Sequence, residues 1–410
     1  MNRRIVILAA LGAAAAAALA WTAVHHFYFD SGVYSGAVRY WFRDGGMIYD
    51  YLKEGTPYGF TYPPFAALVM IPMAVLPLWL IVTVASVATV VTTVLVTWWF
   101  LCPLIERRGW TPWYAVAVAS CLALFFEPVR ETFGFGQVNL LLLALVAGDV
   151  LLGVGRGRRW AGVGIGVATA IKLTPGIFIL YLLITRRWRA AVTAIAAAAT
   201  TTLVTAAFWP DASREFWTSA LWDTNRVGNL EYVSNQSLRG FLARLPVDAV
   251  ESQLWVAGVL AAVGLWAWRV RAADPLGGLA LTGIVGCLIS PVTWVHHWVW
   301  LLPALVRCVE TARTHKGVFR LAVAGYVVVC TRVTFLYENG PKPPLAFLGA
   351  NLYVLLGVAL LLWLPAVASL ADGPRSDDRG RSLDDDRAGR AVVQAAAVRV
   401  HDDRRDQQDQ

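Results

Sequence analysis

Asp30 stands where a carboxylate can take part in acid–base chemistry. It ends the sequence His25-His26-Phe27-Tyr28-Phe29-Asp30, directly after a long apolar segment. Aromatic neighbours at a membrane–water boundary keep a carboxylate partly dry, which raises its affinity for a proton and suits a general base. The alternative is a helix cap or a solvated surface charge. Asp30 is therefore the candidate catalytic residue.

Lys172 is a second unusual charge, because it interrupts an apolar segment within Ala170-Ile171-Lys172-Leu173-Thr174-Pro175. A lysine at the centre of a membrane helix costs roughly 2.5–3.5 kcal/mol on insertion scales, so a retained one is a functional candidate. Pro175 breaks the helix and frees a backbone carbonyl, which makes a polar notch. The ammonium group suits a lipid phosphate. The alternative is that Lys172 snorkels to the membrane interface.

His296 and His297 lie in Ser290–Trp298, at the end of another apolar segment. A neutral imidazole binds a sugar hydroxyl, and a protonated one neutralises phosphate. A metal site would need further ligands, and adjacent histidines on a helix point in different directions. We therefore expect neither a metal ion nor a cofactor.

Several other polar side chains are candidates for binding a donor or an acceptor. Side-chain amides donate and accept hydrogen bonds, which suits sugar hydroxyls, although they equally tie helices together. Tyr62 precedes Pro63-Pro64, which fix an abrupt entry into the next helix. The first interpretation of this motif is therefore structural, and a contact between Tyr62 and a substrate is the second. The candidates are Tyr62, Gln137, Asn139, Asn235, Gln236 and Arg239.

The amino-acid composition indicates whether these residues belong to a soluble protein or to a membrane protein. The chain is 58% hydrophobic and 15% charged, whereas soluble domains carry roughly 25% charged residues. The excess apolar surface must face lipid. The basic residues behind the net charge of +8 occur in short clusters between apolar segments, which is typical of topology signals and not of a nucleic-acid partner.

Apolar segments of about 20 residues are long enough to span a bilayer as helices and too long for barrel strands. They predict an all-α fold, a polytopic helical bundle with roughly nine to twelve crossings in residues 1–370. Residues 371–410, rich in Asp and Arg, are expected to be a disordered cytoplasmic tail. The segments lie near 5–24, 62–77, 79–101, 111–127, 138–153, 160–183, 188–208, 253–270, 276–292, 296–309, 317–336 and 348–370.

The basic clusters predict the topology. Arg3 and Arg4 place the N-terminus in the cytoplasm, so the first loop, 25–61, lies outside with an interfacial amphipathic helix within 31–54. If 62–77 and 79–101 both cross, the clusters at 107–108 and 156–159 lie outside, against the positive-inside rule. If one of them is re-entrant, 160–183 must be re-entrant too. The sequence leaves both alternatives open.

Scattered motifs across 25–300 together resemble the actinobacterial polyprenol-phosphate-mannose-dependent α-1,2-mannosyltransferases. These are membrane glycosyltransferases of the GT-C class, and the resemblance is strongest to the branch that adds a fifth mannose to phosphatidylinositol mannosides. The motifs are Asp30 with Val33-Tyr34, Thr61-Tyr62-Pro63-Pro64, Gly136-Gln137-Val138-Asn139, Lys172-Leu173-Thr174-Pro175, Asn235-Gln236-Ser237-Leu238 and Ser290–His297.

The resemblance implies a multi-pass protein of the inner membrane with an extracytoplasmic active site. Its substrates would be a polyprenyl phosphate mannose donor and a mannosylated phosphatidylinositol lipid. The catalytic aspartate of the family corresponds to Asp30, and an important late histidine to His296 or His297. Asp30 would take the proton of a mannose 2-hydroxyl, while Lys172 and a histidine hold the departing phosphate. The alternatives are another lipid-linked sugar, such as arabinose, and a lipid or sugar transporter.

Overall fold

The computed structural model describes residues 3–223, 226–338 and 344–368. The described residues form helices and no β-strand, with isolated bridges only at Leu52–Gly59 and Asn235–Trp294. This confirms the all-α prediction. The expected tail, 371–410, lies outside the described residues.

Four described helices are long and apolar enough to cross a membrane, in agreement with a helical membrane protein. They are α1 (Arg3–His26), α4 (Leu78–Arg108), α10 (Trp188–Phe208) and α13 (Glu251–Val270). A fifth span is formed if α5 (Pro112–Phe125) and α6 (Glu127–Phe135), which meet at 67°, count as one. The remaining helices are shorter, so the number of crossings stays a prediction.

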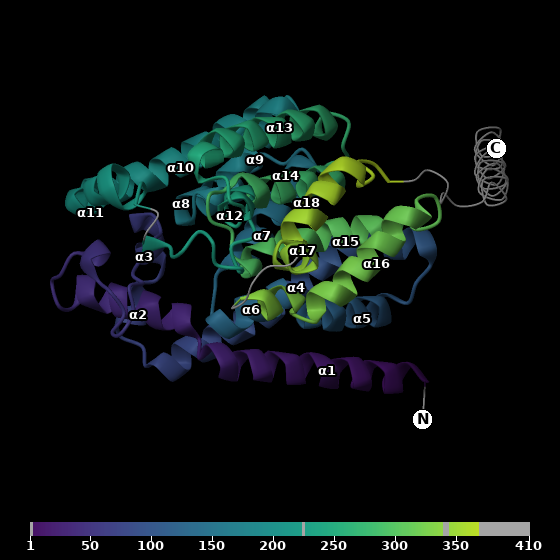
Figure 1. Cartoon of the computed structure of the whole chain (residues 1–410), viewed down its shortest axis with the longest axis horizontal. Helices are drawn as coiled ribbons and strands as arrows, with labels where there is room; N and C mark the ends of the chain where they lie inside the picture. Colours follow the sequence, from purple (N-terminus) through teal and green to yellow (C-terminus); the bar gives the residue numbers. More distant parts are fainter. Residues whose placement is uncertain (1–2, 224–225, 339–343, 369–410) are drawn as a thin grey trace, which may run out of the picture.

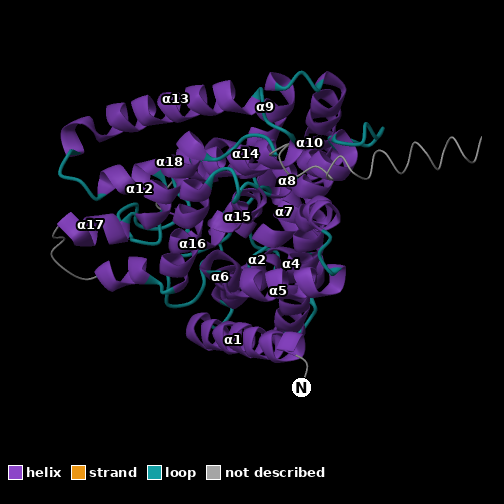
Figure 2. Cartoon of the chain, turned by 90° about the vertical axis from the view of Figure 1, so that its right-hand side faces the viewer, coloured by secondary structure: helices purple, strands orange, loops and turns teal. Residues whose placement is uncertain are grey.

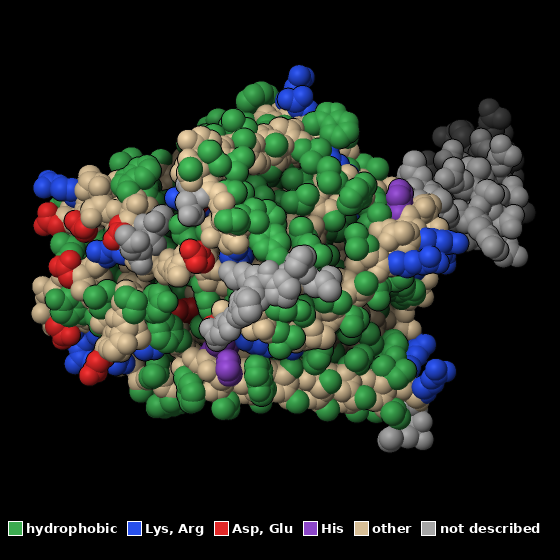
Figure 3. Space-filling model, in the orientation of Figure 1, with side chains coloured by type: hydrophobic (Ala, Val, Ile, Leu, Met, Phe, Trp, Pro, Cys, Tyr) green, Lys and Arg blue, Asp and Glu red, His purple; other side chains and the backbone are tan. Residues whose placement is uncertain are grey.

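On the face drawn in Figure 3, hydrophobic side chains cover much of the middle, and most charged side chains lie toward the left and right ends. In Figures 1 and 2, α1 lies along one edge and α13 along the opposite edge. Between them lie α7 (Asn139–Gly148), α14 (Pro275–Ile289), α15 (Leu301–Glu310), α16 (Lys316–Cys330), α17 (Pro344–Ala350) and α18 (Leu352–Trp363).

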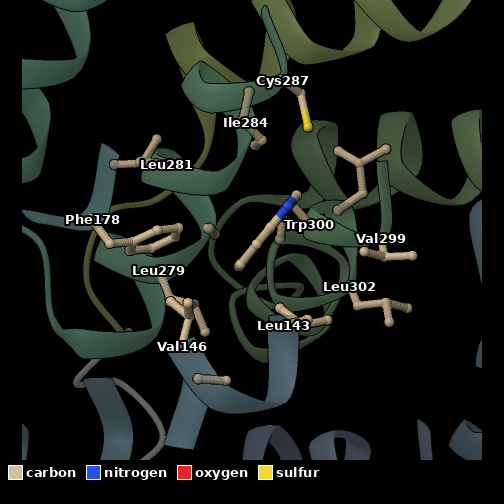
Figure 4. Packing of buried hydrophobic residues seen from close by; sticks show 14 of the residues in the cluster. Leu143, Val146, Phe178, Leu279, Leu281, Ile284, Cys287, Val299, Trp300 and Leu302 are labelled. Carbon is tan, nitrogen blue, oxygen red and sulfur yellow. The ribbon is translucent and has the colours of Figure 1, made fainter. Parts of the chain in front are cut away.

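The core packs around α14, whose side chains are buried on nearly every face. Figure 4 shows apolar residues of α14, α7 and the segment after Val295 turned toward one another. Phe178 lies 5.1 Å from Trp300, ring centre to ring centre. A Cβ at Gly283 would stand 2.7 Å from the Cβ of Trp300, so glycine is needed for this close approach.

The segment 62–77 does not form a spanning helix. It forms α3 (Pro64–Val69) and the 3-10 helix η2 (Ile71–Ala74), which packs against α2 (Phe29–Phe42). Arg39 of α2 donates a hydrogen bond from Nη2 to the carbonyl of Leu76, at 2.5 Å. The chain then enters α4 directly at Leu78.

Segment 160–183 is broken near its middle and turns back. Its parts are α8 (Val163–Ile171), the 3-10 helix η4 (Thr174–Gly176) and α9 (Ile177–Ile184). Arg189, which follows α9, donates to the carbonyls of Gly157 (3.2 Å) and Arg158 (2.7 Å), which precede α8. Both ends of the segment therefore lie together, and its topology in the membrane stays a prediction.

A buried carboxylate fixes the start of α8. Asp149 begins the π-helix η3 (Asp149–Val154) and is 1% exposed. It accepts backbone hydrogen bonds from Gly162 (2.7 Å) and Ile165 (2.9 Å). These N–H groups have no partner inside the helix, so Asp149 acts as a cap supplied from another helix. It thereby fixes the helix that ends directly before Lys172.

Candidate active site

A cavity of about 850 Å³ opens at the end of α1 that carries His26. Ligand sites typically measure roughly 300–1,000 Å³, so this one has room for several sugar rings. Six of the residues predicted from the sequence line it, namely Asp30, Tyr62, Gln137, Lys172, His296 and His297. These residues come from segments far apart in the chain, which the fold brings into one space.

The turn between α1 and α2 positions Asp30. Phe27 and Tyr28 both have positive φ, 50° and 49°, an uncommon conformation for residues with side chains. The backbone N–H of Tyr28 donates to Gly134 (3.0 Å), and the Ser31 hydroxyl donates to the carbonyl of Gly136 (3.1 Å). The first turn of α2 is thus attached to the end of α6, which places Asp30 beside Gln137.

Asp30 and His297 are the two ends of a chain of polar contacts. Gln137 donates from Nε2 to Asp30 Oδ2 at 2.6 Å and accepts the Tyr62 hydroxyl at Oε1, at 2.9 Å. The Lys172 ammonium contacts the Tyr62 oxygen at 3.4 Å and His297 Nε2 at 2.9 Å. The predicted base and the predicted phosphate-binding group therefore share one connected site.

Two further residues hold this chain in place. The Tyr34 hydroxyl lies 2.9 Å from that of Tyr62. Asn139 accepts from Lys172 Nζ at Oδ1 (3.1 Å) and donates from Nδ2 to the carbonyl of His296 (3.2 Å). Asn139 is buried and lies behind the cavity wall. It orients Lys172 and His296, and it lines a small separate cavity together with Lys172 and His297.

The environment of Asp30 makes its carboxylate a stronger base than usual. Burial raises the pKa of Asp30 to about 6, while the hydrogen bond from Gln137 and the charges of Lys172, Lys53 and His26 oppose the rise. A group with a pKa near 6 is mostly ionised at neutral pH and still binds a proton readily. These are the properties of a general base.

The two histidines have different surroundings. His297 Nδ1 accepts the backbone N–H of Trp294 (3.2 Å), and its Nε2 contacts Lys172. His296 is 5% exposed, lines the cavity and packs against Phe135 at 5.2 Å. Its Nε2 has no hydrogen-bond partner among the described residues. A buried polar atom without a partner costs about 1–3 kcal/mol, so His296 Nε2 is prepared for a ligand.

Asn235 and Gln236 have a structural place behind the site. Asn235 Oδ1 accepts the N–H of Thr293 (2.9 Å), and the Gln236 backbone N–H donates to the Thr293 carbonyl (2.7 Å). Gln236 also donates from Nε2 to Ala350 (2.7 Å). Within the described part of the chain, neither residue belongs to the cavity wall. Instead of the expected substrate contact, they satisfy backbone groups of an irregular loop that leads to His296.

Arg239 also lies away from the cavity wall formed by the described residues. Its Nε is 3.5 Å from Glu251 Oε1, and its guanidinium lies 5.0 Å from the centre of the Trp255 ring. Arg239 thus links the short helix α12 (Leu238–Ala243) to α13, whereas the sequence predicted a contact with substrate.

Sequence reasoning did not single out a charged cluster that lines the same cavity. Glu131 pairs with His26, Nε2 to Oε2 at 2.6 Å, and with Arg332. Arg332 also lies over the Trp21 and Phe335 rings, at 4.9 and 4.4 Å. Three charges within 127–131, at the end of an apolar segment, are the sequence signal that could have identified this cluster. No group of three potential metal ligands occurs in the described ranges.

Comparison with known proteins agrees with this chemistry. A relative from Mycobacterium tuberculosis is 34% identical over 80% of this chain and 82% of its own length. It is named a polyprenol-phosphate-mannose-dependent alpha-(1-2)-phosphatidylinositol mannoside mannosyltransferase. A second, from the same species, is 33% identical over 78% of this chain and 76% of its own length, and its name gives phosphatidylinositol pentamannoside in place of phosphatidylinositol mannoside.

More distant similarity extends to another sugar. An alpha-(1->3)-arabinofuranosyltransferase of Mycobacterium tuberculosis is 30% identical over 38% of this chain and 36% of its own length. No solved structure matches the chain significantly. The family described as glycosyltransferase family 87 matches residues 60–291. With this match and relatives that align over most of its length, the chain belongs to glycosyltransferase family 87.

Proposed function

We propose that this glycosyltransferase moves mannose from polyprenyl phosphate mannose to a 2-hydroxyl of a mannosylated phosphatidylinositol lipid, with inversion to an α-1,2 linkage. The observation that carries the proposal is the connected site from Asp30 through Gln137, Tyr62 and Lys172 to His297. The names of the relatives supply the substrates.

In the proposed reaction the acceptor oxygen attacks the anomeric carbon of the donor mannose. The bond from that carbon to the phosphate oxygen breaks, and its electron pair leaves with the polyprenyl phosphate. The proton of the acceptor hydroxyl passes to Asp30. Gln137 binds Oδ2 of this carboxylate, which leaves Oδ1 for the incoming hydroxyl. One base is enough, because a phosphate is a good leaving group.

We assign the donor phosphate to Lys172 and His296. Asn139 contacts both residues, at Lys172 Nζ and at the His296 carbonyl, and so holds them at one place on the wall. The ammonium offsets the negative charge that grows on the departing phosphate. His296 Nε2 is the buried ring nitrogen prepared for a ligand. His297 is engaged by Lys172 and Trp294 and is assigned to positioning.

We further propose that the site faces the extracytoplasmic side of the inner membrane. Arg4 donates to Thr111 (3.2 Å), and Arg107 pairs with Glu310, so these basic residues gather at one end of the molecule. By the positive-inside rule this end is cytoplasmic. Asp30 follows the other end of α1. Nine to twelve crossings of the GT-C type in one domain, 1–370, with 160–183 re-entrant, fit this orientation.

The second candidate is transfer of arabinose from a lipid-linked donor, which the partial similarity to an arabinofuranosyltransferase favours. The catalytic groups would serve both reactions, because the base and the phosphate site do not depend on the sugar. The assay below therefore includes both donors.

The test is a transfer assay with the purified protein in lipid nanodiscs. Polyprenyl phosphate mannose and polyprenyl phosphate arabinose are each offered with phosphatidylinositol mannosides of increasing length. We expect a mannosylated lipid whose new linkage is α-1,2 by NMR, with no product from the arabinose donor. Product from the arabinose donor alone would favour the second candidate. Absence of product with every pair would refute both.

A further inference from the structure

The cavity has an aromatic wall that the proposed chemistry does not use. Trp294, Tyr232 and Tyr58 line it together with the catalytic residues. The Tyr232 and Trp294 ring centres are 6.0 Å apart with an angle of 64° between the rings. The Tyr58 ring meets the Phe29 ring edge-on, with 5.8 Å between the ring centres. Phe29 directly precedes Asp30 in the sequence. A line of rings thus extends along the wall away from the base.

The backbone at Gly228 is fitted between two of these rings. Its φ is +118°, and a Cβ there would stand 3.3 Å from the Trp294 ring and 3.4 Å from Tyr58. Glycine therefore allows this loop to pack against both rings. The contact restricts the orientation of the Trp294 ring, which directly precedes the 3-10 helix Val295–Trp300.

These rings are not ordinary core residues. Tyr232 and Tyr58 are 39% and 38% exposed, and Trp294 is half-buried at the cavity wall. Trp298, four residues after Trp294, shows the contrast, because it is fully buried and donates from Nε1 to the Gln236 carbonyl. A large ring that stays open to a cavity leaves apolar surface that a ligand can cover.

The chemistry of the rings suits a sugar. One face of a hexose carries C–H groups that pack flat on an aromatic ring, while its hydroxyl groups remain at the edge for polar partners. Such partners, Ser234, Arg226 and Glu338, line the same cavity. The proposed donor brings a single mannose. Additional sugar rings can come only from the acceptor.

We propose that Trp294 and Tyr232 form a subsite for the acceptor mannose next to the one that reacts. This inference rests on the proposed function and adds a preference for an oligomannosyl acceptor. The subsite would orient the reacting 2-hydroxyl toward Asp30 by holding the neighbouring ring. It would also make the enzyme prefer longer mannosides over a single mannose.

The test compares two acceptors, a monomannosyl and a dimannosyl phosphatidylinositol, with Trp294→Ala and the wild type. We expect the KM for the dimannosyl lipid to rise roughly tenfold, about the size of one lost ring contact, with the KM for the monomannosyl lipid unchanged. Trp294→Phe keeps an aromatic ring and should therefore keep the KM for the dimannosyl lipid close to the wild-type value. Trp222→Ala is the matched control, because Trp222 is 73% exposed and lies outside the described cavity wall.

Tyr232→Ala provides a second variant if Trp294→Ala does not fold. Equal losses with both acceptors, or no loss with either, would overturn the subsite. If the wild type transfers no mannose to any lipid, the proposed function fails separately. Binding of free α-mannobiose, followed by saturation-transfer NMR, then decides on the subsite alone. Contact signals in the wild type that vanish in Trp294→Ala support the subsite, and signals that persist or never occur refute it.

Discussion

Replacing Gln137 by leucine tests how the site tunes its base. Gln137 donates to Asp30 Oδ2 at 2.6 Å and accepts from Tyr62 at 2.9 Å. Leucine has a similar volume but forms neither hydrogen bond. In the wild type, the hydrogen bond from Gln137 stabilises the ionised form of Asp30. Removal of this bond therefore raises the pKa of the Asp30 carboxyl.

The size of the effect follows from the charge on the acceptor. A hydrogen bond to a charged group contributes about 1.5–3 kcal/mol, and one pKa unit corresponds to about 1.36 kcal/mol. The pKa of Asp30, raised by burial to about 6, should therefore rise by a further one to two units. Asp30 accepts a proton only when ionised. At pH 7 its ionised fraction should fall from about nine-tenths to between one-half and one-tenth.

The assay is kcat/KM for the acceptor measured between about pH 5 and pH 9, which reports the free enzyme. The acid limb of the Gln137→Leu profile should move to higher pH by one to two units, with activity recovering as the pH rises. Gln253→Leu, on the exposed start of α13, should leave the profile unchanged. An acid limb that stays in place in Gln137→Leu would refute the role of this hydrogen bond.

Four further substitutions separate the other roles. Lys172→Met should raise the Kd for polyprenyl phosphate about tenfold or more through loss of the cation; unchanged binding by titration calorimetry would contradict the assignment. His296→Ala should raise the KM for the donor about tenfold and leave the midpoint of thermal unfolding unchanged. His297→Ala should lower both kcat and the midpoint of thermal unfolding. The opposite pattern would exchange the roles of the two histidines. Asp149→Ala removes the hydrogen bonds to Gly162 and Ile165 and should destabilise the protein by about 1–2 kcal/mol. A thermal-shift measurement should show this loss as a lower melting temperature. A melting temperature equal to that of the wild type would argue against Asp149 as a helix cap.

The residue types of the site were predictable because they conflict with their surroundings. Asp30 and Lys172 are charges beside or within apolar segments, and such charges are costly unless used. The break at Pro175 was predictable for the same kind of reason, because proline cannot continue a helix hydrogen-bond pattern. The structure shows a break at this point, and it places Asp30, Lys172 and His297 in one cavity, while their roles stay predictions.

The roles of the amide side chains could not be predicted. Gln137 and Gln236 are chemically identical, yet one contacts Asp30 and the other bonds to the backbone of Ala350. The difference depends on which loops meet in space, and the sequence of either loop alone does not contain it. Arg332 escaped notice because an arginine at the end of an apolar segment is ordinary at a membrane interface. Its pairing with Glu131 depends on the approach of α16 to α6.

The direct test of the account is a single-turnover measurement with Asp30→Asn and, as control, Asp44→Asn at an exposed position just after α2. Radiolabelled polyprenyl phosphate mannose is bound first, and transfer to the acceptor is then followed. We predict that Asp30→Asn binds the donor like the wild type and transfers mannose at least about a hundredfold more slowly, while Asp44→Asn transfers normally. Transfer by Asp30→Asn at the wild-type rate would contradict the assignment of Asp30 as the base.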